Sequence, residues 1–419
     1  MEFNIIFLIS ACVIGVFMTW GVGANDLANI MSTTMGSRAI TVRQAMIIAV
    51  VFEFAGAFLG GMHVTNTIRS GIINTALFAG NAEVLIYGMI AVLLASMVWM
   101  LFASYIGMPV SITNAIVGAL VGFGAVVLGL HAVHWNTVGL IALSWVCTPI
   151  AAGIGSYWLF TLVRRLILAT RDPLQSSRRY MPLYFFMVGV VLSVMTVLRE
   201  IVRFGYHPDG LHQFLIIIAT SFIIAIIGMF LCSKIKLPEN AKRYQRYEYI
   251  EKKFGILMAF TACAMVFAHG SNDVAIAVGP VAAIYSIVMH NGSLLMRDPI
   301  PLWIMFMGCM GVVTGLFMYG RKVIATVGRH ITSLTPSRAF AATFAAAVAV
   351  IVSTSSGIPV SATQTLVGGV FGVGLARGIG ALNLNVIRNI FLSWFVTVPA
   401  AAMLAILFFN ILQWMFHFL

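Results

Sequence analysis

Charge is the scarcest property of this sequence. Only 9% of its 419 residues are charged, whereas 61% are apolar and the mean hydropathy is +1.02. An average soluble domain carries about 25% charged residues. A soluble protein of this composition could not cover its surface with polar side chains, and a lipid bilayer removes that need. The long continuous apolar stretches predict an all-α integral membrane protein rather than a β-barrel.

Recognised catalytic patterns are also missing. The sequence contains no Walker motif, no HExxH and no GxSxG, which argues against ATP hydrolysis and membrane proteolysis. We therefore expect a protein that is not an enzyme and that needs no cofactor beyond a coupling ion. The five cysteines lack CxxC spacing and lie in or at the ends of apolar stretches, where they are predicted to pack as small apolar residues.

Membrane topology explains the basic excess of this chain. The net charge is +12, and two basic loops, 164–182 and 234–253, are separated by two apolar stretches, so both lie on one face. The positive-inside rule places them in the cytoplasm, and no nucleic-acid partner is expected. We count about twelve apolar segments at roughly 20 residues per span, some short enough to be hairpins. This organisation predicts a multi-pass protein of the cell membrane, which is the inner membrane in a Gram-negative bacterium.

The chain repeats itself. Residues 107–124 and 357–374 are identical at nine of eighteen positions, at an offset of 357 − 107 = 250. GANDLAN begins at 23 and GSNDVAI at 270, an offset of 247, and two similar SW segments begin at 144 and 393. Such matches predict two homologous halves, 1–165 and 251–419, joined by a linker, 166–250, with two helices and basic cytoplasmic loops. Duplicated halves are typical of secondary transporters, and an inverted arrangement is favoured.

Two aspartates occupy equivalent positions in the halves. Asp26 follows Asn25, and Asp273 follows Asn272, each pair coming after a glycine and a small residue. A carboxylate inside the membrane is costly and marks a functional site, and the glycine permits a helix break. Carboxylate, amide and unwound backbone oxygens suit an alkali cation, although a cap at a helix start is the alternative. Glu53, within the apolar run VFEFAGAFLGG, is a third candidate for cation binding or coupling, or else forms a structural pair.

A Pro-Val-Ser-x-Thr element is duplicated as well. Ser111 and Thr113 in the first half correspond to Ser361 and Thr363 in the second. Proline fixes a turn or a first helical position, so the hydroxyls and free amides that follow stand at a helix N-terminus, where anions bind. Two such termini would surround a tetrahedral anion with donors, although capping or packing is the plainer reading.

Two further signals lie outside this duplicated element. Gln44, after Arg43, could donate to an anion. The glycine pairs at 118 and 122 and at 368 and 372 have the GxxxG spacing, which predicts close helix packing.

These segments resemble the duplicated signature of the inorganic phosphate transporter family. The resemblance is carried by GANDLAN, GSNDVAIAVGP, GSRAITVRQAMIIAVVFEFAGAFLGG, TIRSGIIN, TPSRAFAATFAAA, SATQTLVGG and RNIFLSWFVTVPA, and it covers nearly the whole chain except the linker. It implies about twelve membrane segments in two inverted repeats with re-entrant hairpins. It also implies uptake of inorganic phosphate by symport with sodium or protons, in a protein that can form homodimers.

The resemblance also implies which residues bind. Sodium would lie at Asn25, Asp26, Asn272 and Asp273, with Glu53 as a further candidate. Phosphate would lie at Ser111, Thr113, Ser361 and Thr363, with Gln44 and Gln364. The chain departs from the usual pattern at Ile112, Ala362, Ile276, Thr343 and Asn114. Because of these departures, a permease for sulfate or another oxyanion is the alternative, and an anion channel is a less favoured one.

Overall fold

The computed structural model describes residues 2–78, 81–106, 110–203, 209–237, 242–290, 299–320, 334–378 and 384–417. Within these ranges the chain is helical apart from short turns and one isolated bridge between Ile73 and Val133. Nine of its described helical stretches are long and apolar enough to cross a membrane. The chain is therefore an all-helical multi-pass membrane protein, as its composition predicted.

The two halves contain corresponding helices, with one helix pair between them. The first half comprises α1 (Glu2–Val22), η1 (Gly23–Leu27), α2 (Ala28–Gly36), α3 (Val42–Gly60), α4 (Met62–Asn66), η2 (Thr67–Gly71), η3 (Thr75–Phe78), α5 (Ala82–Tyr105), α6 (Ile112–Val127), η4 (Leu130–Ala132), α7 (Trp135–Val163) and η5 (Arg164–Leu168). The pair between the halves is α8 (Pro173–Arg203) and α9 (Gly210–Ser233). The second half comprises α10 (Arg243–His269), η6 (Gly270–Val274), α11 (Ala275–Met289), α12 (Leu302–Gly315), η7 (Leu316–Gly320), α14 (Pro336–Ser355), α15 (Ala362–Arg377) and α16 (Leu384–His417).

The helices α6 and α15 follow the duplicated Ser-x-Thr elements and are short. Each has 16 residues, or about 24 Å of helix, which is less than the roughly 30 Å of a bilayer core. They are the expected hairpin helices, and they explain why fewer spans are found than the twelve apolar segments counted in the sequence. Pro109 lies outside the described residues.

Each hairpin helix packs on the last helix of the other half. The backbone of α16 comes so close to Gly118 and Gly122 of α6 that a side chain at either glycine would collide with it. Gly368 and Gly372 of α15 meet the backbone of α7 at Pro149 and Gly153 in the same way. The GxxxG spacings therefore mark close helix packing, as predicted, and the two halves interlock rather than forming separate units.

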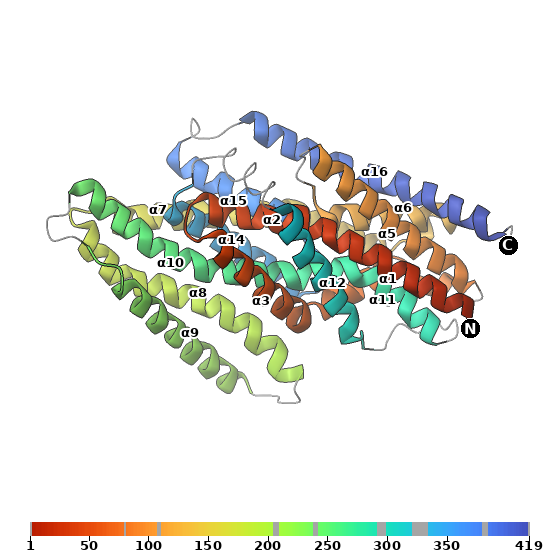
Figure 1. Ribbon diagram of the computed structural model, residues 1–419, viewed down its shortest axis with the longest axis horizontal. Helices are drawn as coiled ribbons and strands as arrows, with labels where there is room; N and C mark the ends of the chain where they lie inside the picture. Colours follow the sequence, from red (N-terminus) through yellow and green to blue (C-terminus); the bar gives the residue numbers. More distant parts are fainter. Residues whose placement is uncertain are drawn as a thin grey trace.

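The helices that carry the Asn-Asp pairs run in opposite directions. In Figure 1, the chain passes from right to left along α1 and α2, and from left to right along α10 and α11. The expected break after Gly23 and Gly270 is instead a single π-helical turn, so the helix widens without unwinding. Both glycines are needed for close approach, because Gly23 abuts the backbone of Val312 and Gly270 abuts that of Glu53. A π-helical turn of this kind is frequent at functional sites.

Candidate functional site

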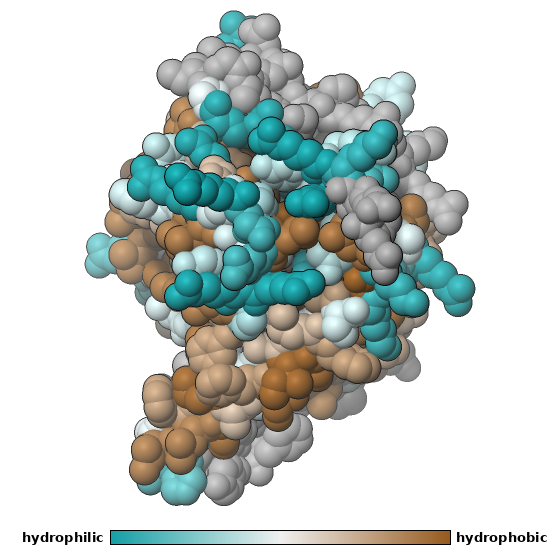
Figure 2. All heavy atoms as spheres, turned by 90° about the vertical axis from the view of Figure 1, so that its left-hand side faces the viewer, coloured by the Kyte–Doolittle hydropathy of each residue, from teal (hydrophilic) through white to brown (hydrophobic). Residues whose placement is uncertain are grey.

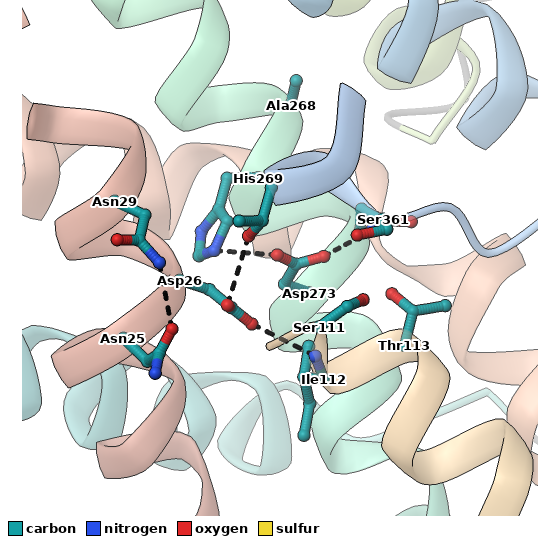
Figure 3. Close-up of polar contacts among 12 residues, drawn as sticks. Asn25, Asp26, Asn29, Ser111, Ile112, Thr113, Ala268, His269, Asp273 and Ser361 are labelled. Atoms are coloured by element: carbon teal, nitrogen blue, oxygen red, sulfur yellow. Dashed lines mark hydrogen bonds and ion pairs between the residues drawn. The ribbon is translucent and has the colours of Figure 1, made fainter. Parts of the chain in front are cut away.

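Polar side chains gather where the two π-helical turns meet the starts of α6 and α15. Asp26 and Asp273 are each 1% exposed, and Ser111 and Ser361 are 2% and 1% exposed. Figure 3 shows the two carboxylates converging from separate helices, with Ser111 and Ser361 beside them. The structure thus brings together the aspartates and the serines that the sequence repeat singled out.

Asp26 connects the two hairpin helices. Its Oδ2 accepts a hydrogen bond from the backbone N–H of Ile112 at 3.2 Å, at the start of α6. Its Oδ1 accepts from the hydroxyl of Thr363 on α15 at 3.1 Å. One carboxylate from the first half therefore holds one donor from each hairpin, which makes it the link between the two candidate anion sites.

The second Asn-Asp pair is held more firmly. Asn272 Nδ2 donates to the carbonyl oxygen of Val360 at 2.5 Å, and the N–H of Val360 donates back to Asn272 Oδ1 at 3.1 Å. The same amide group also donates to Asp273. Thr113 of α6 donates its hydroxyl to the same Val360 carbonyl at 2.8 Å. The segment before α15 is thus anchored both by the second half and by the first hairpin.

Asn25 faces elsewhere. Its Nδ2 donates to Ser104 Oγ on α5 at 3.0 Å, and its Oδ1 accepts from Asn29 Nδ2 at 3.0 Å. In Figure 3 its side chain points away from Asp273. The two asparagines, equivalent in sequence, therefore have different partners.

A histidine that sequence reasoning missed lies beside the second aspartate. His269 Nε2 lies 2.9 Å from Asp273 Oδ2, and His269 Nδ1 lies 2.7 Å from Glu53 Oε1. None of the three side chains is more than 2% exposed. Because a carboxylate faces each ring nitrogen, a ring protonated at both nitrogens satisfies both contacts. The spacing of four residues between His269 and Asp273 on a helix was the one available signal.

Glu53 was predicted as a cation ligand, and the structure turns one of its oxygens toward His269 instead. Its Oε2 has no hydrogen-bond partner within the described residues. Glu53 therefore contacts the aspartate site through the histidine rather than directly.

The first turns of the hairpin helices carry two buried side-chain amides at equivalent positions. Ser111 accepts from the N–H of Asn114 at 3.5 Å, and Ser361 accepts from that of Gln364 at 3.2 Å, so both serines cap their helices. The side-chain oxygens Asn114 Oδ1 and Gln364 Oε1 are buried, and neither has a hydrogen-bond partner in the described part of the chain. A buried acceptor without a partner is costly, so both oxygens are available to a ligand that donates hydrogen.

Gln44 does not belong to this cluster. Its side chain is exposed and closes a capping box at the start of α3, where Gln44 Oε1 accepts from the N–H of Thr41 at 2.9 Å. The third position of a helix favours glutamine for this contact. The hypothesis that Gln44 donates to an anion is therefore not supported by its location.

The positions that depart from the family pattern are apolar or paired. Ile112 and Ile276 lie in the largest apolar core cluster, and Ala362 lies in a second cluster. In Figure 3 the side chain of Ile112 points away from the polar groups while its N–H faces Asp26. Thr343 lies 3.3 Å from the hydroxyl of Thr33. These changes leave the hydroxyls at Ser111 and Ser361 in place.

Interlocked helical halves around a buried set of carboxylates, amides and hydroxyls define a membrane transporter. The chain belongs to the phosphate transporter family, whose model matches residues 22–405. This confirms the resemblance found in the sequence motifs. Because the family and its named members are transporters, it also points away from an enzyme.

Individual relatives agree with this assignment. A putative phosphate permease of Haemophilus influenzae is 44% identical over 408 residues, covering 97% of this chain and 96% of that protein. The chloroplastic inorganic phosphate transporter 2-1 of Arabidopsis thaliana is 39% identical over 417 residues, covering 94% of this chain and 70% of that protein. A solved structure, described as the sodium-dependent phosphate transporter, has a TM-score of 0.87 and 36% identity, with 97% of this chain and 99% of that chain covered.

Proposed function

We propose that this protein imports inorganic phosphate across the cell membrane by symport with sodium. The observation that carries the proposal is the position of Asp26, which accepts from Ile112 N–H and from the Thr363 hydroxyl at once. A sodium ion at Asp26 would neutralise the carboxylate and weaken its hold on these two donors. The donors would then be free for an anion, so cation binding would promote anion binding at the adjacent hairpins.

Sodium is proposed to bind at the two Asn-Asp pairs, Asn25 with Asp26 and Asn272 with Asp273. Their buried carboxylate and amide oxygens are hard ligands of the kind that such a cation prefers, and the name of the similar solved structure supports sodium as the coupling ion. We propose that Glu53 positions Asp273 through His269, because its one bonded oxygen is on the imidazole.

Phosphate is proposed to bind between the starts of α6 and α15, at Ser111, Thr113, Ser361, Thr363 and Gln364. At neutral pH phosphate still carries a proton that it can donate, whereas sulfate carries none. The unpartnered oxygens of Asn114 and Gln364 suit a ligand that donates. An unmet polar group on a desolvated ligand costs about 1–3 kcal/mol, or roughly one to two decades in affinity. This favours phosphate over sulfate, which remains the alternative substrate.

The proposed architecture is a pair of inverted repeats, 1–165 and 251–419, joined by 166–250 and containing about twelve membrane segments with two re-entrant hairpins. The opposite directions of α1 and α10 and the short lengths of α6 and α15 support it. We also propose residence in the cell membrane, which is the inner membrane in a Gram-negative bacterium, and association as a homodimer.

Uptake into proteoliposomes tests this function. Labelled phosphate and labelled sulfate are offered separately, under an inward sodium gradient at constant pH or under a proton gradient without sodium. We expect phosphate to accumulate only with sodium, and unlabelled phosphate to compete better than sulfate. Equal accumulation under the proton gradient alone would replace sodium with protons as the coupling ion. A current without saturable, ion-dependent uptake would favour a channel.

A further inference from the structure

A groove lies between α8 and α9, the two helices that connect the halves. It has a volume of about 530 Å³, and every residue that lines it is apolar. The lining comes from Pro182, Leu183 and Phe186 on α8 and from Phe222, Ala225, Ile226 and Met229 on α9. Its walls are open to the outside of the molecule, since Phe222 is 56% and Ile226 is 67% exposed. In a membrane this groove faces lipid.

Arginines stand at the α8 end of the groove. Arg179 precedes Pro182, Leu183 and Phe186 by three, four and seven residues, a spacing that places all four on one face of the helix. Arg179 is exposed and lies about 4.5 Å along the helix axis from Pro182. Its neighbour Arg178 is exposed as well. The groove therefore begins about one helical turn from two cations.

A lysine stands at the α9 end. Lys234 is the residue at which α9 ends, and its Nζ lies 4.6 Å from the centre of the Phe230 ring. Phe230 is 60% exposed on the outside of the helix. The ammonium group therefore lies at the outer, lipid-facing surface, as long basic side chains do at a membrane interface.

The nearest acid in sequence does not neutralise these bases. Asp172 Oδ1 accepts hydrogen bonds from the N–H groups of Leu174 and Gln175 at 3.0 and 3.2 Å, which caps α8. Figure 2 shows this end of the molecule, with a band of hydrophilic side chains and a hydrophobic surface beneath it, on the side where α8 and α9 lie in Figure 1. The groove thus combines an apolar channel with a positive end.

We propose that this groove binds an anionic phospholipid of the cytoplasmic leaflet. Its phosphate would contact Arg178, Arg179 and Lys234, and an acyl chain would lie along the groove. The basic loops are cytoplasmic by the positive-inside rule, which selects the leaflet. From Met229 to Phe222 the α9 wall extends about 10.5 Å, which fits within the roughly 15 Å of one leaflet of the hydrocarbon core.

Charge argues against a second copy of the chain as the occupant. A two-fold contact about an axis normal to the membrane would place the arginines and the lysine of one copy against the same residues of the other. Like charges brought together repel, whereas an anionic headgroup neutralises them. A neutral phospholipid would fill the apolar channel but leave the cations unmatched, so the proposal is specific for anionic lipid.

Native mass spectrometry of the purified full chain tests the proposal. The protein in detergent is titrated with phosphatidylglycerol or with phosphatidylcholine of the same acyl chains, in separate samples. The wild type is expected to retain phosphatidylglycerol preferentially. Combining Arg179→Gln with Lys234→Gln should weaken phosphatidylglycerol retention by about fivefold per base removed, since each basic residue at an anionic surface is worth about 1 kcal/mol.

A matched control removes the same charge from other helices at this end. Arg43→Gln with Lys252→Gln alters exposed bases on α3 and α10, and it should leave retention unchanged. Excess inorganic phosphate should not displace the lipid, which separates this site from the proposed transport site. Equal retention of the two lipids by the wild type, or an equal loss in the control, would overturn the proposal. A lipid-free dimer that the Arg179→Gln and Lys234→Gln variant dissociates would assign the groove to a second copy.

Discussion

The two Asn-Asp sites are equivalent in sequence but differ in what holds them. In the second half, Asp273 contacts His269, which contacts Glu53. The counterpart of His269 in the first half is residue 269 − 247 = 22, a valine. The counterpart of Glu53 is Val312, because Gly23 abuts Val312 as Gly270 abuts Glu53. An ion network thus supports one aspartate, while apolar side chains occupy both corresponding places beside the other.

This difference suggests a division of labour between the two aspartates. Asp273 is fixed by a charged partner whose own contacts are complete on both sides of the ring. Asp26 is bonded instead to Ile112 N–H and the Thr363 hydroxyl, groups that belong to the proposed phosphate site. We infer that Asp26 senses the substrate directly, whereas Asp273 forms the more rigid side of the site.

Neutralising either aspartate should have the largest effect. Asp26→Asn and Asp273→Asn should each reduce sodium-driven phosphate uptake by at least about a hundredfold, because a buried charge that loses its partner costs about 3–5 kcal/mol. Only Asp273→Asn should also lower the unfolding temperature, since it removes one partner of His269. Uptake and thermal unfolding of the purified variants measure the two effects. Near wild-type uptake in both variants would leave the aspartates as helix caps alone.

The ion network can be replaced by the apolar pair of the other half. His269→Val leaves Glu53 and Asp273 as neighbouring buried carboxylates and should destabilise the protein by about 3–5 kcal/mol. Adding Glu53→Val copies the Val22 and Val312 arrangement and should recover part of that loss. A double-mutant cycle of thermal stability measures the coupling. Strictly additive losses would show that Glu53 and His269 do not act together.

Two threonines separate the roles of the hairpins. Thr363→Val removes the hydroxyl that donates to Asp26 and should raise the sodium concentration for half-maximal uptake about tenfold. Thr113→Val is the matched change in the other half. It removes a bond to the Val360 carbonyl rather than to a carboxylate, so its effect on sodium dependence should be smaller. The opposite order would place the sensing aspartate in the second half.

Selectivity should depend on the two unpartnered oxygens. Gln364→Leu or Asn114→Leu removes a buried acceptor that suits the proton of phosphate, and each should reduce the preference for phosphate over sulfate by up to about tenfold. Competition of each unlabelled anion against labelled phosphate measures this. Ser111→Ala or Ser361→Ala should instead weaken phosphate binding itself, because each removes a hydroxyl of the proposed site. An unaltered phosphate-to-sulfate ratio in both leucine variants would mean that the oxygens face away from the anion.

The smallest effect is expected at Gln44. Gln44→Ala removes the capping box of α3 and should cost about 0.5–2 kcal/mol of stability, while phosphate uptake per folded protein stays unchanged. Uptake assays normalised to folded protein check this. A strong rise in the phosphate concentration needed for uptake would return Gln44 to the anion site.

The sequence alone was enough to find the class of protein and most of the buried polar cluster. Composition determined that the chain lies in a bilayer, because so few charges cannot cover a soluble protein. Internal repetition then selected Asp26 and Asp273, and likewise Ser111 and Ser361, since a carboxylate or hydroxyl kept at equivalent places in an apolar segment stands out. The GxxxG spacing correctly predicted the close helix contacts.

Only the tertiary structure decided which of these residues meet and what supports them. Glu53 and His269 are 216 residues apart in the chain, and Asp26 and Thr363 are 337 apart. No local periodicity encodes such contacts, because they arise where helices of different halves cross and interlock. For the same reason the sequence placed Gln44 with the anion although it caps α3, and it gave no partner to Glu53. Side-chain identity is local, whereas the charge that neutralises a buried carboxylate comes from whichever helix packs beside it.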